Sequence, residues 1–180
     1  MEITTPRLIL REFTQEDLPA LLRYQADPRY SEFHGPEETG PDLAHKLIGM
    51  FLSWAAERPR QNYQLAIAQR DHPEEAIGSC GVRLRGCEAG RAEFGLELAP
   101  GHWGRGFAGE AARAILEFAF RDFGVEEVRG ITITENARVQ RLVERLGFTR
   151  VETRPGADWM SARGWSETVW GITAAEWSGE

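Results

Sequence analysis

A glycine-rich segment at residues 103–111 (WGRGFAGEA) constrains the fold of this chain more than any other stretch. Gly104, Gly106 and Gly109 allow a tight turn and a close approach of the backbone to a ligand. An amphipathic helical pattern over residues 107–123 follows directly. Free amides at a helix start, together with the helix dipole, attract anions. The segment therefore predicts a strand-to-helix turn that binds phosphate or pyrophosphate.

The three glycines also match the dinucleotide-binding pattern G-x-G-x-x-G, so a nicotinamide or flavin enzyme is an alternative. That fingerprint belongs to a parallel β-α-β unit with an acid about 20 residues further on, at the end of the next strand. Here Glu126 and Glu127 precede the next strand, and Glu135 lies too far along. The strands before the loop are also joined by short turns, as in an antiparallel meander. The context therefore disfavours this alternative.

Hydrophobic periodicity divides the chain into strands and helices. We expect strands at residues 8–11, 63–68, 76–85, 91–99, 128–134, 148–153 and 168–173, and helices beginning near residues 14, 42, 107 and 136. The chain has 180 residues and no linker or repeat. The sequence therefore predicts one domain over residues 1–180 of the α+β (mixed α/β) class.

Composition excludes several classes of protein. The net charge is −7, and such an acid excess argues against a nucleic-acid partner. No apolar run approaches the ~20 residues that a membrane span needs, and the N-terminus lacks a signal-peptide pattern. Cys80 and Cys87 have no partners at metal spacing, and the four histidines are scattered. We therefore expect a cytoplasmic protein with no membrane partner and no metal.

Taken together, several segments resemble the GNAT superfamily of acetyl-CoA-dependent N-acetyltransferases, and within it the branch of the ribosomal-protein N-terminal (alanine/serine) acetyltransferases. The resemblance spans nearly the whole chain and depends on the order and spacing of its parts. The matching parts are residues 5–11, 77–79, 92–96, 103–111, Asn136, residues 146–148 and residues 176–177.

The resemblance implies a fold and a cofactor site. The expected fold is a central twisted mixed sheet of about seven strands flanked by about four helices, in which the strand at 93–99 splays from the strand at 128–134. Pantetheine would enter the gap and pair with backbone near Leu96 and Leu98. Asn136 would contact the CoA arm, although a helix N-cap explains it equally well, and Arg141 would meet CoA phosphates. The diphosphate loop corresponds to Arg105, Gly106, Phe107, Ala108, Gly109 and Glu110.

The resemblance also implies catalytic residues. A protonated amine must lose a proton before it attacks the thioester, and the family uses a carboxylate for this step. Glu93 aligns best with that carboxylate, and Glu97 on the same strand face is the second candidate; either one is also explained as an exposed strand residue. The branch often has Ser at the position of Val139, and no Tyr follows Tyr63. The expected general acid is therefore missing.

The expected function is acetyl transfer to a primary amine, of a protein N-terminus or a small molecule, by direct attack in a ternary complex. Because the acid is missing, the alternative is an acetyl-CoA-binding domain with weak or no activity that serves interaction. The resemblance places the acceptor between residues 27–35 and 155–170, with Tyr30, Phe33, His34 and Trp165 as candidate contacts. The acid surplus of the two chain ends favours a cationic acceptor. The branch also allows a homodimer.

Overall fold

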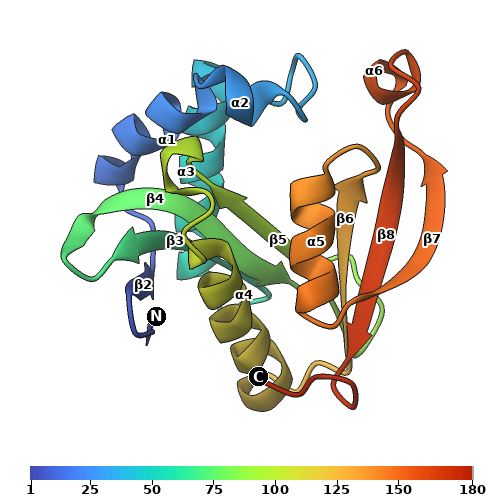
Figure 1. Cartoon of the computed structure of the whole chain (residues 1–180). Coiled ribbons are helices and arrows are strands. Elements are labelled where there is room, and N and C mark those ends of the chain that lie inside the picture. Colours follow the sequence, from blue (N-terminus) through green and yellow to red (C-terminus); the bar gives the residue numbers. More distant parts are fainter. Residues whose placement is uncertain (180) are drawn as a thin grey trace.

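The chain builds one mixed sheet with the strand order β1-β2-β3-β4-β5-β6-β8-β7 (Figure 1). The structure is a computed structural model that describes residues 1–179. The strands are β1 (Glu2–Thr4), β2 (Leu8–Arg11), β3 (Asn62–Gln69), β4 (His72–Arg83), β5 (Arg91–Leu98), β6 (Glu127–Ile133), β7 (Thr149–Pro155) and β8 (Ser166–Thr173). The mixed class, the single sheet and the antiparallel β3-β4-β5 meander are as predicted. The eighth strand, β1, is too short to leave a periodic signal.

Four helices match the predicted ones, and two helices of four residues each lie outside them. The helices are α1 (Leu18–Gln25), α2 (Pro28–Ser31), α3 (Pro41–Ala56), α4 (Phe107–Glu117), α5 (Ala137–Arg145) and α6 (Asp158–Ser161). The helix predicted over 107–123 continues from α4 as a π-helical turn, Phe118–Asp122. Within residues 1–179 no helix is both long and apolar enough to cross a membrane, and no cluster of His, Cys, Asp or Glu is placed to hold a metal ion.

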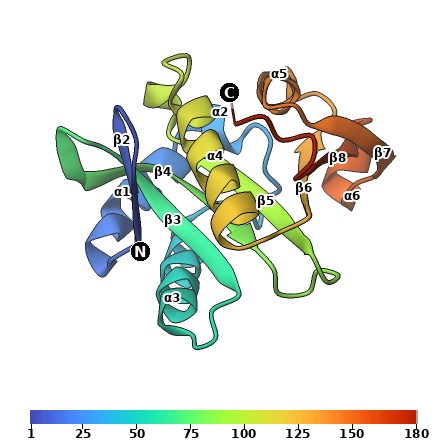
Figure 2. The same ribbon diagram turned by 90° about the horizontal axis from the view of Figure 1, so that it is seen from below.

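The sheet carries a separate hydrophobic core on each face. Leu65 and Ile67 of β3 are fully buried in the core that α4 and α5 complete. Ala66, between them, faces the core formed with α1 and α3, where Ile48 is buried. Figure 2 shows α3 and α4 on opposite sides of β3. The alternation of side chains along a strand thus fixes which helices cover which face.

The sheet opens between β5 and β6, as the resemblance implied. Their parallel pairing includes only Arg91–Glu93 on β5 and Glu127–Arg129 on β6. Beyond these pairs β5 stays paired with β4 as far as Leu98, and β6 stays paired with β8 as far as Ile133. The two halves of the sheet therefore diverge toward the carboxyl ends of β5 and β6.

The open edge of β5 presents backbone groups to this gap. The amide of Ala99 donates to the carbonyl of Ile77 on the β4 side, at 2.8 Å. Because the backbone groups of successive strand residues point to opposite edges, those of Leu96 and Leu98 point toward the gap. The end of β5 therefore has no strand partner on this edge, where β6 has moved away, although the carbonyl of Leu98 accepts a hydrogen bond from the Trp103 indole at 2.7 Å.

Gly78 of β4 lies against the end of β5, so a substitution there measures how tightly this part of the sheet packs. A Cβ on Gly78 would sit 2.3 Å from the carbonyl oxygen of Glu97. We expect Gly78→Ala to lower the free energy of unfolding by about 1–3 kcal/mol, because the strands must separate to admit the methyl group. Chemical denaturation measures the effect.

Gly49 supplies the matched control, because it lies exposed in the middle of α3 with nothing within 4 Å of its added Cβ. Gly49→Ala should raise the free energy of unfolding by about 0.5–1 kcal/mol. A Gly78→Ala protein as stable as the wild type would contradict the close packing of β4 on β5.

Candidate functional site

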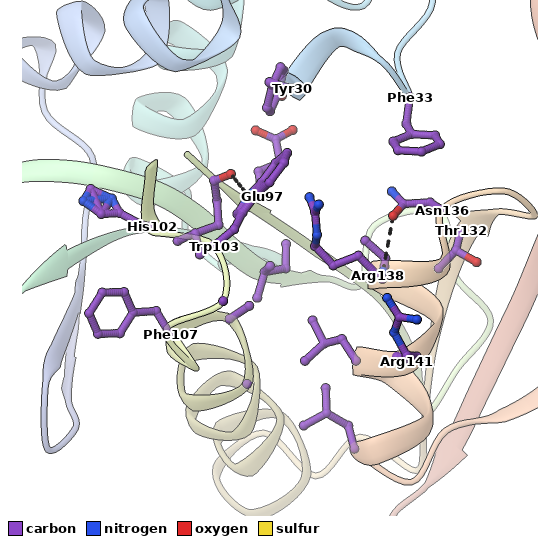
Figure 3. A pocket seen from close by; sticks show the side chains of 18 of the residues that line it. Tyr30, Phe33, Glu97, His102, Trp103, Phe107, Thr132, Asn136, Arg138 and Arg141 are labelled. Carbon is purple, nitrogen blue, oxygen red and sulfur yellow. Dashed lines mark hydrogen bonds between the residues drawn. The ribbon is translucent and has the colours of Figure 1, made fainter. Parts of the chain in front are cut away.

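A cavity of about 700 Å³ occupies the gap between β5 and β6. Its walls come from the ends of these two strands, the loop before α4, the first turns of α4, the length of α5, and the segment around α2. Figure 3 shows Tyr30 and Phe33 at one end of the cavity, and Phe107 and Arg141 toward the other. The cavity therefore connects the predicted acceptor segment with the glycine loop.

The glycine loop brings free amides to the cavity wall. Gly104 and Gly106 have φ of +75° and +82°, values that other residues rarely adopt, and the chain turns there into α4. The first α-helical hydrogen bond of α4 runs from the amide of Glu110 to the carbonyl of Gly106, at 3.1 Å. The amides of residues 107–109 consequently have no acceptor within the helix. With the helix dipole behind them, these amides form a site suited to an anion.

Glu110 holds this loop from outside the cavity. Its carboxylate accepts hydrogen bonds from the hydroxyl of Thr5 (2.7 Å), the amide of Arg7 (2.8 Å) and Nε of Arg7 (2.7 Å). Burial alone would raise the pKa of the Glu110 carboxyl, but these hydrogen bonds lower it below the usual value. Glu110 does not line the cavity, so the structure places it as a support for the loop and not at the anion.

Arg105 also departs from its expected place. Its guanidinium lies 4.9 Å from the ring centroid of Phe107, and its carbonyl accepts a hydrogen bond from Nη1 of Arg7 at 2.9 Å. The Arg105 side chain does not line the cavity. Since the C=O and N–H of a trans peptide point in opposite directions, the bond to Arg7 fixes the orientation of the Gly106 amide. Arg105 therefore contributes to the site through its peptide group, whose orientation Arg7 fixes, and its charged side chain does not line the cavity.

Helix α5 begins at the cavity. Asn136 is its N-cap, and the side-chain oxygen accepts a hydrogen bond from the amide of Val139 at 3.3 Å. Both residues line the cavity, as does Arg141. The N-cap role is thus present, and it leaves Asn136 at the wall, where a ligand can also meet its amide.

Two further residues of the cavity wall form a contact that sequence reasoning missed. The guanidinium of Arg138 lies 3.9 Å from the ring centroid of Trp103, and the Trp103 indole donates to the carbonyl of Leu98 at 2.7 Å (Figure 3). This chain of contacts links α5 to the open end of β5. Trp103 adjoins the glycine motif, but nothing in the sequence indicates that it meets Arg138.

Glu97 is the strand glutamate that reaches the cavity. The hydroxyl of Tyr24 donates to its carboxylate at 3.4 Å. Burial, and next the negative charge of Glu97, raise the pKa values of Tyr24 and Tyr30 above the ordinary phenol value. Both phenols therefore stay protonated beside the carboxylate. Tyr24 was not predicted, because its pairing with Glu97 spans 73 positions of the chain.

Glu93 lies outside this cavity. Its carboxylate pairs with Arg83 at 2.8 Å and its side chain is 52% exposed. Gly95, between the two glutamates, leaves room for the Arg83 guanidinium, since an added Cβ would sit 2.7 Å from Nη2. Glu97 lies four residues beyond Glu93 along the strand, which is about 13 Å. The structure thus separates the two candidate bases that the sequence placed on one face.

The predicted acceptor residues lie together at one end of the cavity. Tyr30, Phe33 and His34 line it, and the rings of Tyr30 and His34 stack with centroids 4.3 Å apart. Trp165 does not line the cavity but packs behind Phe33, with ring centroids 5.6 Å apart. Trp165 therefore acts on this end of the cavity only through Phe33.

Comparisons with known proteins identify a family that matches most of the chain. The family model "Acetyltransferase (GNAT) domain" matches residues 7–149. An uncharacterized N-acetyltransferase, p20, of Bacillus licheniformis is 29% identical over 147 residues, which are 81% of each chain.

Two solved structures from Vibrio cholerae share the fold. One is described as a putative ribosomal-protein-serine acetyltransferase, with TM-score 0.73, 19% identity, and coverage of 96% of this chain and 97% of that one. The other is a spermidine N-acetyltransferase in complex with CoA and spermine, with TM-score 0.78, 17% identity, and coverage of 96% and 98%.

The open sheet, the glycine loop at the start of α4 and the family match over residues 7–149 lead to one assignment. The chain belongs to the GNAT family of acetyltransferases.

Proposed function

We propose that this acetyltransferase transfers an acetyl group from acetyl-CoA to a primary amine by direct attack, with Glu97 as the general base. The observation that carries the proposal is the position of Glu97. Its carboxylate lines the same cavity as the free amides at the start of α4 and the open edge of β5. A proton acceptor and an anion site thus lie at two parts of one cavity.

The cavity suits CoA as a substrate. The amides of residues 107–109 would hold the diphosphate. Arg138, Arg141 and Arg145 also line the cavity, and none has an ion pair with a carboxylate among the described residues. Their charge complements the phosphates of CoA. The open edge of β5 at Leu96 would pair with the pantetheine amides, as an added strand does. The carbonyl of Leu98 already accepts from the Trp103 indole, so Leu98 contributes its N–H.

The chemistry needs one proton acceptor. An amine of pKa about 8 to 10.4 is largely protonated near pH 7. Glu97 takes one proton from the ammonium group, and the nitrogen lone pair then attacks the thioester carbonyl carbon. As the C–S bond breaks, the nitrogen gives up its second excess proton, which passes through water to the departing CoA thiolate, so that the amide and the CoA thiol are released. We assign the backbone N–H of Leu98 to the developing oxyanion, because this group points into the gap.

The leaving group needs no dedicated acid. Val139 lines the cavity at the position where the branch often carries Ser. A thiol has a pKa of about 8.5, so its thiolate leaves and takes a proton from water. Because the pKa of Tyr30 is raised by burial and by Glu97, Tyr30 is a hydrogen-bond donor to its surroundings and a poor proton donor to sulfur. The proposal therefore gives Tyr30 a positioning role.

The acceptor is an amine of a protein N-terminus or of a small molecule. The two structural relatives from Vibrio cholerae are named for a ribosomal protein and for spermidine, two different acceptors on one fold. We keep the ribosomal-protein N-terminal acetyltransferases as the proposed branch, because several segments of the sequence resemble that branch. The fold alone does not choose between these acceptors.

The first prediction compares the two glutamates of β5. Glu97→Gln should lower kcat by about 10²–10⁴-fold at neutral pH, because the base is lost, while the Kd for acetyl-CoA stays unchanged. The lost activity should return in part as the pH rises toward the pKa of the amine. Glu93→Gln, the matched control on the same strand, should keep kcat near the wild-type value. Thiol release and calorimetric titration measure the two quantities.

Two results would contradict this assignment. If Glu93→Gln loses activity and Glu97→Gln does not, the base is Glu93. If the wild-type protein binds acetyl-CoA but releases no thiol with any amine, the alternative of an acetyl-CoA-binding interaction domain replaces the enzyme.

The second prediction concerns the support of the glycine loop. Glu110→Gln removes the charge that Thr5 and Arg7 hold, so the loop amides lose their fixed orientation. We expect the Kd for acetyl-CoA to rise about tenfold, which corresponds to the loss of one charge-assisted hydrogen bond. Glu37→Gln, an exposed loop carboxylate, is the control and should leave the Kd unchanged.

The same residue predicts a pH dependence of stability. The pKa of Glu110 is lowered in the folded state, so its contribution is present above the pKa of the unfolded chain and is lost as the pH falls through the folded pKa. The difference in Tm between wild type and Glu110→Gln should therefore be larger near pH 7 than near pH 3.5. An equal difference at both pH values would contradict the carboxylate's role.

A further inference from the structure

We infer that the acceptor is a small amine with one positive charge and a flat apolar group. This inference rests on the proposed function and narrows its acceptor. Three features of the cavity carry it: a single carboxylate, an aromatic wall that is held in place, and packing between two segments beside that wall.

The first feature is the charge of the cavity. Among the described residues that line it, Glu97 is the only acid, whereas five are arginines. Arg29 stands at the acceptor end, and its charge is already paired with Asp27 at 2.6 Å. A polyamine would bring further ammonium groups to a wall that offers them no second carboxylate. The acid surplus at the chain ends, which favoured a cationic acceptor, thus lies outside the residues that line the cavity.

The second feature is the aromatic wall. Tyr30 is 5% exposed and is stacked on His34, so its ring cannot leave the wall. Phe33 is backed by Trp165, and the guanidinium of Arg163 lies 5.0 Å from the Trp165 ring centroid. Because these rings already pack on one another, their side chains lose little conformational entropy when a ligand binds. A preformed aromatic wall beside one carboxylate suits an amine with a flat apolar group.

The third feature limits the size of the acceptor. Nη1 of Arg163 donates to the carbonyl of Glu32 at 3.2 Å. Gly35 packs on Trp159, since an added Cβ would lie 2.6 Å from the indole nitrogen. The segment after α2 and the segment around α6 therefore touch, next to the Phe33 wall, at the same end of the molecule (Figure 1). This contact favours a small molecule over a protein chain.

An amine panel tests the inference. The purified protein, saturated with acetyl-CoA, would be assayed for thiol release with phenethylamine, n-butylamine, spermidine and a peptide with a free N-terminal serine. We expect kcat/KM for phenethylamine to exceed each of the others by about tenfold or more, the value of burying one aromatic ring. A higher kcat/KM for spermidine or for the peptide would overturn the inference and leave the proposed transfer intact. If no amine releases thiol, the proposed function fails and the inference with it.

A variant of Phe33 tests the wall directly. Phe33→Glu adds a second carboxylate and removes a ring, so the ratio of kcat/KM for spermidine to that for phenethylamine should rise about tenfold or more. Phe123→Glu is the control, because Phe123 is 37% exposed and does not line the cavity; its ratio should match the wild type. The Kd for acetyl-CoA should not change in either variant.

Phe33→Leu is a second variant that tests the same wall if Phe33→Glu does not fold. It keeps an apolar side chain without the ring and should lower kcat/KM for phenethylamine while leaving that for n-butylamine unchanged. If Phe33→Leu affects both amines equally, the aromatic wall does not select the acceptor.

Discussion

The short pairing between β5 and β6 is the constraint on which the site depends. Only three residues on each strand pair, and then each strand follows its own antiparallel neighbour. A fully paired sheet would cover the backbone of Leu96 and Leu98 and leave no cavity. The opening also sets the place of the glycine loop, because η2 (Pro100–His102) and the loop follow the free end of β5. The local loss of strand pairing thus creates the cavity and leaves backbone N–H groups of β5 free to donate hydrogen bonds to a ligand.

The supports of the loop come from far along the chain. Thr5 and Arg7 reach Glu110 across more than 100 residues, and Arg7 also orients the Arg105 peptide. Arg7 and Glu110, which belong to the segments that resemble the family, therefore act on the loop and need not touch a ligand. Their hydrogen bonds preorganise amides that have no other acceptor, which is how a neutral backbone is made to bind an anion.

Local patterns predicted much of the fold. The period-two alternation gave the meander, and the glycines with the following helical pattern gave the turn into α4. The same alternation could not distinguish Glu93 from Glu97. It predicts which face of the strand a side chain lies on, but not which position along the strand reaches the cavity. Their environments differ through tertiary contacts: Arg83 pairs with one, and Tyr24 with the other. No local signal predicts such contacts between distant segments, and the Arg138–Trp103 contact was missed for the same reason.

Amide hydrogen exchange with and without acetyl-CoA tests the central claim most directly. If the gap between β5 and β6 holds the substrate, the amides of Leu96, Leu98 and residues 107–109 should become protected when acetyl-CoA is added. The exposed amides of the turn between β3 and β4 should exchange as before. Binding of acetyl-CoA without protection of these strand and loop amides would contradict the account.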